Sequence, residues 1–183
     1  MKLLALSLSL RQESYNTKLI KLAASIAKNN NTEIEFLDLK EYDMPAYSED
    51  IQNTKGFPET AESFKNKLNK AQGLIIASPE YNYSYPGSFK NIFDWISRYR
   101  PMPWSNKVAL FLSASPSLVG GNRALWDLRR PFEGCGTFVY PTMFSLSSTH
   151  QAFNEKNELV DPEKFKNLTE IVTSFLKFAK QFN

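Results

Sequence analysis

Short runs of apolar residues alternate along this chain with stripes of apolar residues spaced three and four positions apart. The runs have the length of β-strands, and the stripes are typical of helices that bury one face. A chain that alternates strand and helix in units of about 30 residues forms a parallel sheet with helices on both faces and right-handed crossovers. The sequence therefore predicts an α/β fold. Its strands are expected at residues 3–8, 33–39, 74–77, 108–112 and 137–140.

Two of the predicted strands differ in a way that indicates their places in the sheet. Residues 33–39 alternate between polar and apolar side chains, which favours a half-buried strand at an edge. Residues 108–112 are apolar on both faces, as a central strand covered by helices must be.

Five helices are expected between and after these strands. The first lies between residues 16 and 28, and the second begins behind Pro58 and closes at Gly73, where a residue free of the left-handed penalty is wanted. The last begins with Asp161 as its N-cap and Pro162 at its first helical position. The third and fourth carry their apolar stripes at residues 89–96 and 124–128.

Length and composition indicate one domain covering residues 1–183. A chain of this size buries roughly 70% of the surface that it exposes when unfolded, so one core suffices. Cys135 and His150 are the only cysteine and histidine, which excludes an internal disulfide and a structural zinc site and favours a reducing, cytoplasmic setting. With 22 basic and 19 acidic residues the net charge is only +3, so no nucleic-acid partner is expected. The sequence has no apolar run long enough for a membrane span and no signal-peptide pattern.

The loop at residues 9–16 is the first candidate for a binding site. In an open parallel sheet, ligands bind beyond the carboxyl ends of the strands where the strand order reverses, which for the order 2-1-3-4-5 lies between the first and third strands. This loop leads into a helix N-terminus, where free N–H groups and the helix dipole favour an anion. Ser9, Ser14 and Asn16 can donate to phosphate oxygens, and Arg11 adds a positive charge. Ser14 and Asn16 can equally be plain helix caps.

The glycine-rich phosphate motifs are absent. Neither the P-loop motif nor the dinucleotide G-x-G-x-x-G motif occurs in the sequence, which argues against Walker ATPases and dinucleotide-binding Rossmann enzymes. A hydroxyl-rich loop without those glycines favours the phosphate of a mononucleotide.

Two further loops meet the same edge of the predicted sheet. Residues 78–87 carry three tyrosines at alternate positions and two prolines, and such a stiff loop can present backbone N–H groups to the edge of a planar heterocycle with Tyr81 beside it. Alternatively, Tyr83 and Tyr85 pack under the loop or in a dimer contact. Residues 113–121 are small and would let a ring approach the backbone, although loop flexibility would explain them as well.

The motifs in these loops resemble those of a known family. They are Ser9-Leu10-Arg11, Ser14, Asn16, Pro79-Glu80-Tyr81-Asn82, Ser84, Pro86-Gly87, Lys90-Asn91 and Asp94-Trp95. Together they resemble the NADPH-dependent FMN reductases, which include quinone, azo-dye and chromate reductases. The similarity extends from Met1 to about Pro141. Leu8 and Ser117 stand where the family usually has glycine, and they could tighten the turn into the first loop and narrow the flavin edge, respectively.

The resemblance implies a fold, a cofactor and the residues that hold it. The fold is a flavodoxin-like three-layer sandwich with a five-stranded parallel sheet of order 2-1-3-4-5. The cofactor is FMN, with NADPH or NADH as co-substrate. The residues expected at the phosphate are Ser9, Leu10, Arg11, Ser14 and Asn16. Those expected at the isoalloxazine ring are Pro79, Glu80, Tyr81 and Asn82, with Ser115 approaching from the third loop.

The implied reaction is a hydride relay from NAD(P)H through FMN to a small-molecule acceptor such as a quinone, azo or nitro compound or free flavin. The cofactor carries this chemistry, so no catalytic side chain is expected. A flavodoxin-like electron carrier and a flavin-binding module without turnover are the alternatives. Arg98, Arg100 and Lys107 are candidates for the 2′-phosphate of NADPH. Trp95 lies off the apolar stripe of the predicted helix at 88–97, and this surplus of apolar surface predicts a homodimer or homotetramer whose site is completed by the neighbour.

Overall fold

The predicted alternation of strands and helices is confirmed in a computed structural model that describes residues 1–182. Five of its strands are hydrogen-bonded in the order β2-β1-β3-β4-β5, and every pairing is parallel. The strands are β1 (Lys2–Ser7), β2 (Glu33–Asp38), β3 (Gly73–Ala77), β4 (Val108–Ala114), β5 (Phe138–Val139) and β6 (Phe144–Leu146). The helices are α1 (Tyr15–Asn29), α2 (Glu49–Lys55), α3 (Glu59–Asn69), α4 (Gly87–Ile96), α5 (Asn122–Gly134) and α6 (Pro162–Ala179).

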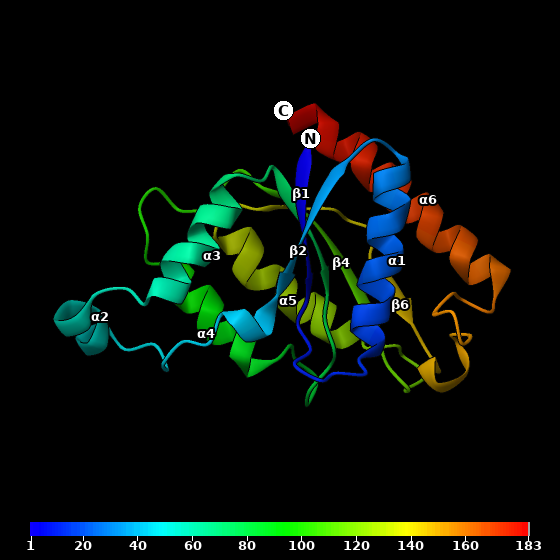
Figure 1. The fold of residues 1–183 in the computed structure, drawn as a ribbon, viewed down its shortest axis with the longest axis horizontal. Helices are drawn as coiled ribbons and strands as arrows, with labels where there is room; N and C mark the ends of the chain where they lie inside the picture. The colour runs from blue at the N-terminus through cyan, green and yellow to red at the C-terminus, as the bar shows by residue number, and fades with distance from the viewer. Residues whose placement is uncertain (183) are drawn as a thin grey trace.

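The sheet lies between two layers of helices (Figure 1). Helices α1 and α6 cover one face, and α3, α4 and α5 cover the other, each against its own cluster of buried apolar side chains. Strands β3 and β4 are buried along their whole length, whereas β2 is largely exposed or half-buried, as expected for central and edge strands.

The fifth position in the sheet is divided between two short strands. Only two residues, Phe138 and Val139, of the predicted strand at 137–140 pair with the first half of β4. The chain then leaves the ladder at Pro141 and returns as β6, which pairs with the second half of β4. Pro141, whose ring fixes its φ angle, stands at the point where the ladder breaks.

Gly73 does not end the helix as predicted. Helix α3 ends at Asn69, with Lys70 as its C-cap, and Gly73 is the first residue of β3. A Cβ at Gly73 would lie 2.4 Å from the carbonyl oxygen of Val108. The glycine is therefore needed because β3 and β4 approach each other closely at this point.

The chain between β2 and α3 makes a long excursion that carries the short helix α2, which the sequence did not predict (Figure 1). This excursion covers Trp95: the indole Nε1 donates a hydrogen bond of 2.8 Å to the carbonyl of Pro45, and Tyr47 and Phe57 pack against the ring. Trp95 is fully buried as a result. Its apolar surface therefore gives no reason to expect a dimer, and the oligomeric state stays a prediction.

The helices of the described residues 1–182 are either too short or too polar to cross a membrane.

Candidate functional site

The loop between β1 and α1 leads into a well-capped helix. Ser14 is the N-cap of α1, and its Oγ accepts hydrogen bonds from the amides of Asn16 (3.2 Å) and Thr17 (3.4 Å). Ser9 Oγ accepts a similar bond from the amide of Arg11 (3.3 Å). In the described residues the amides of Gln12 and Tyr15 have no hydrogen-bond acceptor. The loop therefore offers unpaired N–H donors at the positive end of a 15-residue helix, which suits a phosphate.

Asn16 has a structural partner on the far side of the site. Its side-chain Nδ2 donates to the carbonyl of Ala114 (3.0 Å), and its Oδ1 accepts from the amide of Ala114 (2.9 Å). This pair joins the start of α1 to the end of β4. The side chain is thus occupied by the protein, and its part in holding a phosphate stays a prediction.

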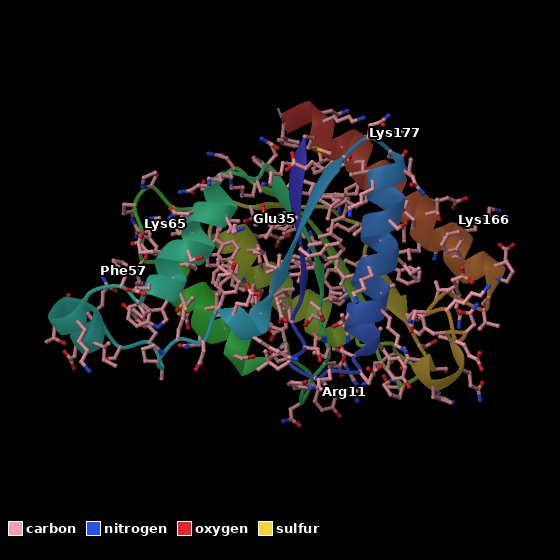
Figure 2. The ribbon with its side chains drawn as sticks, in the orientation of Figure 1. Arg11, Glu35, Phe57, Lys65, Lys166 and Lys177 are labelled. Atoms are coloured by element: carbon pink, nitrogen blue, oxygen red, sulfur yellow. The ribbon has the colours of Figure 1, made fainter. Side chains whose placement is uncertain are left out.

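Arg11 lies at the carboxyl edge of the sheet, at the bottom of the view in Figure 2. Its Nη2 donates to the carbonyl of Glu13 (2.8 Å), and its guanidinium lies 5.6 Å from the centre of the Tyr15 ring. These contacts leave a solvent-exposed cation over the N-terminus of α1.

The second loop folds back on itself as a tight hairpin. Tyr81 and Ser84 exchange two backbone hydrogen bonds of 2.8 and 3.1 Å. The two residues between them, Asn82 and Tyr83, both have positive φ angles (50° and 69°), which is typical of a type I′ turn. Asparagine tolerates this conformation, whereas tyrosine is strained in it.

Helix α5 holds this hairpin in place. Arg123 donates to Oε1 of Glu80 from both Nε (2.8 Å) and Nη2 (2.5 Å), and its guanidinium lies 4.2 Å from the centre of the Tyr83 ring. The hydroxyl of Ser84 donates to the carboxylate of Asp127. Arg123 was not among the predicted site residues, because a partner 43 positions away leaves no local pattern in the sequence.

The third loop is shaped by its own packing. A Cβ at Gly120 would lie 2.9 Å from the backbone of Leu146, and one at Gly121 would lie 3.1 Å from the side chain of Ser113. Both glycines also have positive φ angles, 63° and 85°. Gly120 and Gly121 are therefore required for the contact of this loop with the neighbouring strands. Ser115 is held at the end of β4 by a hydrogen bond from its amide to the carbonyl of Leu146 (3.0 Å).

The three loops meet around a cleft of ≈ 140 Å³. Eight of the predicted residues line it: Ser9, Arg11, Ser14, Asn16, Pro79, Glu80, Tyr81 and Ser115. The other two do not. Leu10 lines a neighbouring cavity with Asn91, and Asn82 lies at the tip of the hairpin. The cleft is smaller than the roughly 300–1,000 Å³ of a typical ligand pocket, so it can enclose only part of a nucleotide.

The donors and acceptors of the cleft fit FMN. Unpaired amides on the first loop suit its phosphate, and Oε2 of Glu80 is buried in the second loop without a hydrogen-bond partner in residues 1–182. A buried, unpaired carboxylate oxygen is costly, and an N–H donor of a flavin ring would satisfy it. Tyr81, which was predicted beside the ring, lines the cleft and is about half exposed.

Leu8 and Ser117, which stand where the family usually has glycine, do not line the cleft. Leu8 is fully buried in the core, and its amide donates to the carbonyl of Ala77 (2.9 Å), so it continues the sheet. Ser117 is exposed, and its amide donates to Oγ of Ser115 (3.2 Å).

The candidates for the 2′-phosphate of NADPH lie away from this cleft. Lys107 precedes β4, at the amino ends of the strands, and its Nζ donates to the carbonyl of Ala71 (2.6 Å). Burial lowers the pKa of this lysine. Arg98 and Arg100 follow α4 and donate to neighbouring groups of residues 94–99. Within one chain, therefore, none of the three lines the cleft.

Cys135 and His150, the single cysteine and the single histidine of the sequence, lie outside the cleft as well. Cys135 is the C-cap of α5, and burial raises the pKa of its thiol, so it is protonated at neutral pH. His150 is exposed on a 3₁₀ turn (Thr149–Gln151).

The chain is similar to known proteins in both sequence and fold. Residues 1–151 match the family of NADPH-dependent FMN reductases. The chain is 31% identical over 175 residues to a quinone reductase of Escherichia coli, covering 94% of this chain and 92% of the relative. It is 35% identical over 167 residues to an NAD(P)H-dependent FMN reductase of Pseudomonas aeruginosa, covering 87% and 85% of the two chains. Among solved structures it is similar to the flavoenzyme NAD(P)H:(acceptor) oxidoreductase FerB of Paracoccus denitrificans, with a TM-score of 0.83, 26% identity and coverage of 99% and 98%.

These matches confirm the predicted flavodoxin-like architecture and the resemblance on which the cofactor was expected. The chain therefore belongs to the family of NADPH-dependent FMN reductases, and is an oxidoreductase with FMN as its cofactor and NAD(P)H as its co-substrate.

Proposed function

We propose that this protein transfers hydride from NAD(P)H through bound FMN to small oxidised acceptors, namely quinones, azo and nitro compounds and free flavin. The observation that carries the proposal is the meeting of the three loops around one cleft that combines unpaired amides with a buried, unpaired carboxylate oxygen. The names of relatives as quinone reductase and NAD(P)H-dependent FMN reductase support it.

The residues of the cleft would bind and orient the cofactor. The unpaired amides of Gln12 and Tyr15 and the cation of Arg11 would hold the phosphate, and the anchored hairpin would set the position of the ring. Bound FMN supplies two-electron chemistry, accepting a hydride and releasing its electrons to an oxidant. Arg123 would keep Glu80 in one rotamer, so that its Oε2 faces the cofactor in a fixed direction.

An exposed rim supports a broad choice of acceptor. Tyr81 is 52% exposed, and the cleft encloses too little space to bury a whole flavin nucleotide. One face of the ring would therefore stay open to NAD(P)H and afterwards to a flat acceptor. A pocket that encloses its substrate selects for the size and shape of that substrate, whereas an open rim of this kind does not.

The test is anaerobic reduction of the reconstituted protein. Protein loaded with FMN is mixed with NADPH or NADH, and the flavin absorbance is expected to bleach within seconds. A benzoquinone, an azo dye, a nitroaromatic and free FMN are then added separately, and each is expected to restore the absorbance. Flavin that stays bound but that neither nucleotide reduces would overturn the proposal and favour an electron carrier.

A further inference from the structure

A groove separate from the cleft lies beside the loop between β1 and α1. None of the residues expected at the isoalloxazine ring lines it. It runs between α1 and β2 at the carboxyl edge of the sheet and has a volume of ≈ 270 Å³. We call it the α1–β2 groove. The residues that matter for its chemistry are Ser9, Arg11, Lys21, Phe36, Asp38 and Lys40.

The groove is strongly cationic. Lys21 and Lys40 are exposed, and neither ammonium group has an ion-pair or hydrogen-bond partner in residues 1–182. Arg11 contributes a third positive charge, against the single carboxylate of Asp38. Unpaired cations around a concave surface favour an anionic ligand with more than one charge.

The groove adjoins the cleft. Ser9 and Arg11 line both, so a group attached to a phosphate in the cleft would lie next to the groove. Asp38 is the last residue of β2 and pairs in register with Ser7 at the end of β1. A carboxylate at the end of the second strand is the feature that binds ribose hydroxyls in dinucleotide-binding α/β sheets. Oδ1 of Asp38 accepts from the amide of Lys40 (3.1 Å), and Oδ2 has no partner among the described residues.

We propose that the α1–β2 groove takes the adenosine monophosphate half of FAD, so that the protein binds FAD as well as FMN. This inference rests on the proposed binding of a flavin in the cleft. Lys21 and Lys40 would contact the second phosphate, and Asp38 would accept from the ribose hydroxyls. Phe36, which is 44% exposed, would give the adenine an apolar contact.

The test compares two flavins on protein that has been stripped of cofactor. FMN and FAD are titrated separately, and binding is followed by calorimetry and by quenching of flavin fluorescence. Wild-type protein is expected to bind FAD at least as tightly as FMN. Lys21→Ala and Lys40→Ala are each expected to weaken FAD about tenfold, because each removes a charge-assisted contact, and to change FMN less than twofold. Lys166→Ala is the matched control, since Lys166 lies on α6, away from the groove (Figure 2), and is expected to change neither.

Three results would overturn the inference while leaving flavin binding in place. The first is FMN binding with FAD at least tenfold weaker in the wild type. The second is an equal effect of the lysine substitutions on both flavins. The third is binding of free AMP to FMN-loaded protein, with an affinity that Lys21→Ala lowers, in a protein that does not bind FAD. Failure of both flavins to bind would instead contradict the proposed function itself, so the two failures are distinguishable.

Discussion

Asn16 and Ala114, which are 98 positions apart in the sequence, form a closed pair of hydrogen bonds in the buried floor of the candidate site. The side-chain amide of Asn16 pairs with Ala114 as the backbone of a neighbouring β-strand would, since it both donates to and accepts from the backbone of that residue. Through this pair the helix that carries the phosphate loop is attached to the strand that ends at the third loop. This side chain therefore helps to fix the distance between two walls of the cleft.

Removing that side chain is expected to destabilise the fold. Asn16→Ala leaves a buried N–H and a buried C=O without partners, which costs about 2–4 kcal/mol. Thermal unfolding should show a fall in Tm of several degrees for a chain of this length. Asn29→Ala, at the exposed other end of α1, is the control and should stay within about 0.5 kcal/mol of the wild type. Equal Tm values for the two variants would show that the pair adds nothing.

The strained turn of the second loop predicts opposite effects of two substitutions. Tyr83→Gly relieves the strain of a positive φ, worth about 1–2 kcal/mol, and loses a contact with Arg123 worth about 0.5–1 kcal/mol. The variant is therefore expected to be as stable as the wild type or slightly more so. Tyr83→Val loses the same contact and keeps a strained, β-branched residue, so it should be less stable by more than 1 kcal/mol. Urea unfolding measures both, and a valine variant as stable as the glycine variant would contradict the assigned turn.

Acid stability depends on Glu35. The pKa of its carboxyl lies below the ordinary value of 4.5 because Lys2 and Lys67 donate to it, the ammonium of Lys2 from 2.6 Å. A lowered pKa in the folded state means that the stabilisation is complete above pH 4.5 and is lost as the pH falls through the folded value. Glu35→Gln should thus flatten the loss of stability between about pH 5 and 3.

Glu33 provides the control for that measurement. Its carboxylate lies 3.4 Å from the ammonium of Lys2 and its side chain is 67% exposed, so water screens the interaction. Glu33→Gln should leave the pH profile of unfolding close to that of the wild type. The same flattening in both variants would mean that general surface charge, and not the Glu35 cluster, sets the profile.

A substitution at Trp95 tests how much the segment between β2 and α3 stabilises the protein by packing over α4. Trp95→Phe removes the indole donor, and the carbonyl of Pro45 keeps only its second hydrogen bond, from Nδ2 of Asn91 (3.0 Å), so the expected cost is about 0.5–1.5 kcal/mol. Trp126→Phe, on the exposed face of α5, should change stability by less than about 0.5 kcal/mol. Denaturant unfolding followed by circular dichroism compares the two, and equal, small effects would contradict the importance of this contact.

Arg11 is expected to contribute to binding the FMN phosphate. Arg11→Ala removes a charge-assisted contact worth about 1.5–3 kcal/mol, which corresponds to roughly a ten- to hundredfold rise in Kd. Arg11→Lys keeps the positive charge but lacks the planar guanidinium group, so its Kd for FMN should lie between those of the wild type and Arg11→Ala. Calorimetric titration of the stripped protein with FMN measures the change. An unchanged Kd for Arg11→Ala would show that the phosphate is held elsewhere.

Much of the site could be predicted because its residues are contiguous in the sequence. The stretches at residues 9–16 and 79–82 follow directly after strands, and the carboxyl ends of parallel strands meet at one edge of a sheet. Eight of the ten predicted residues accordingly line one cleft. The contacts that the sequence did not predict join residues with distant partners: Arg123 with Glu80, Asn16 with Ala114, and Trp95 with Pro45.

The sequence by itself determined the alternation of strands and helices, the start of α6 and the family, because periodicity, caps and contiguous motifs depend on residues that are near one another in the chain. The tertiary structure alone decided which glycines are required for packing, where the fifth strand divides, and which cation restrains the hairpin. These outcomes depend on contacts that exist only once the sheet has brought distant segments within a few ångströms, and no local pattern records them.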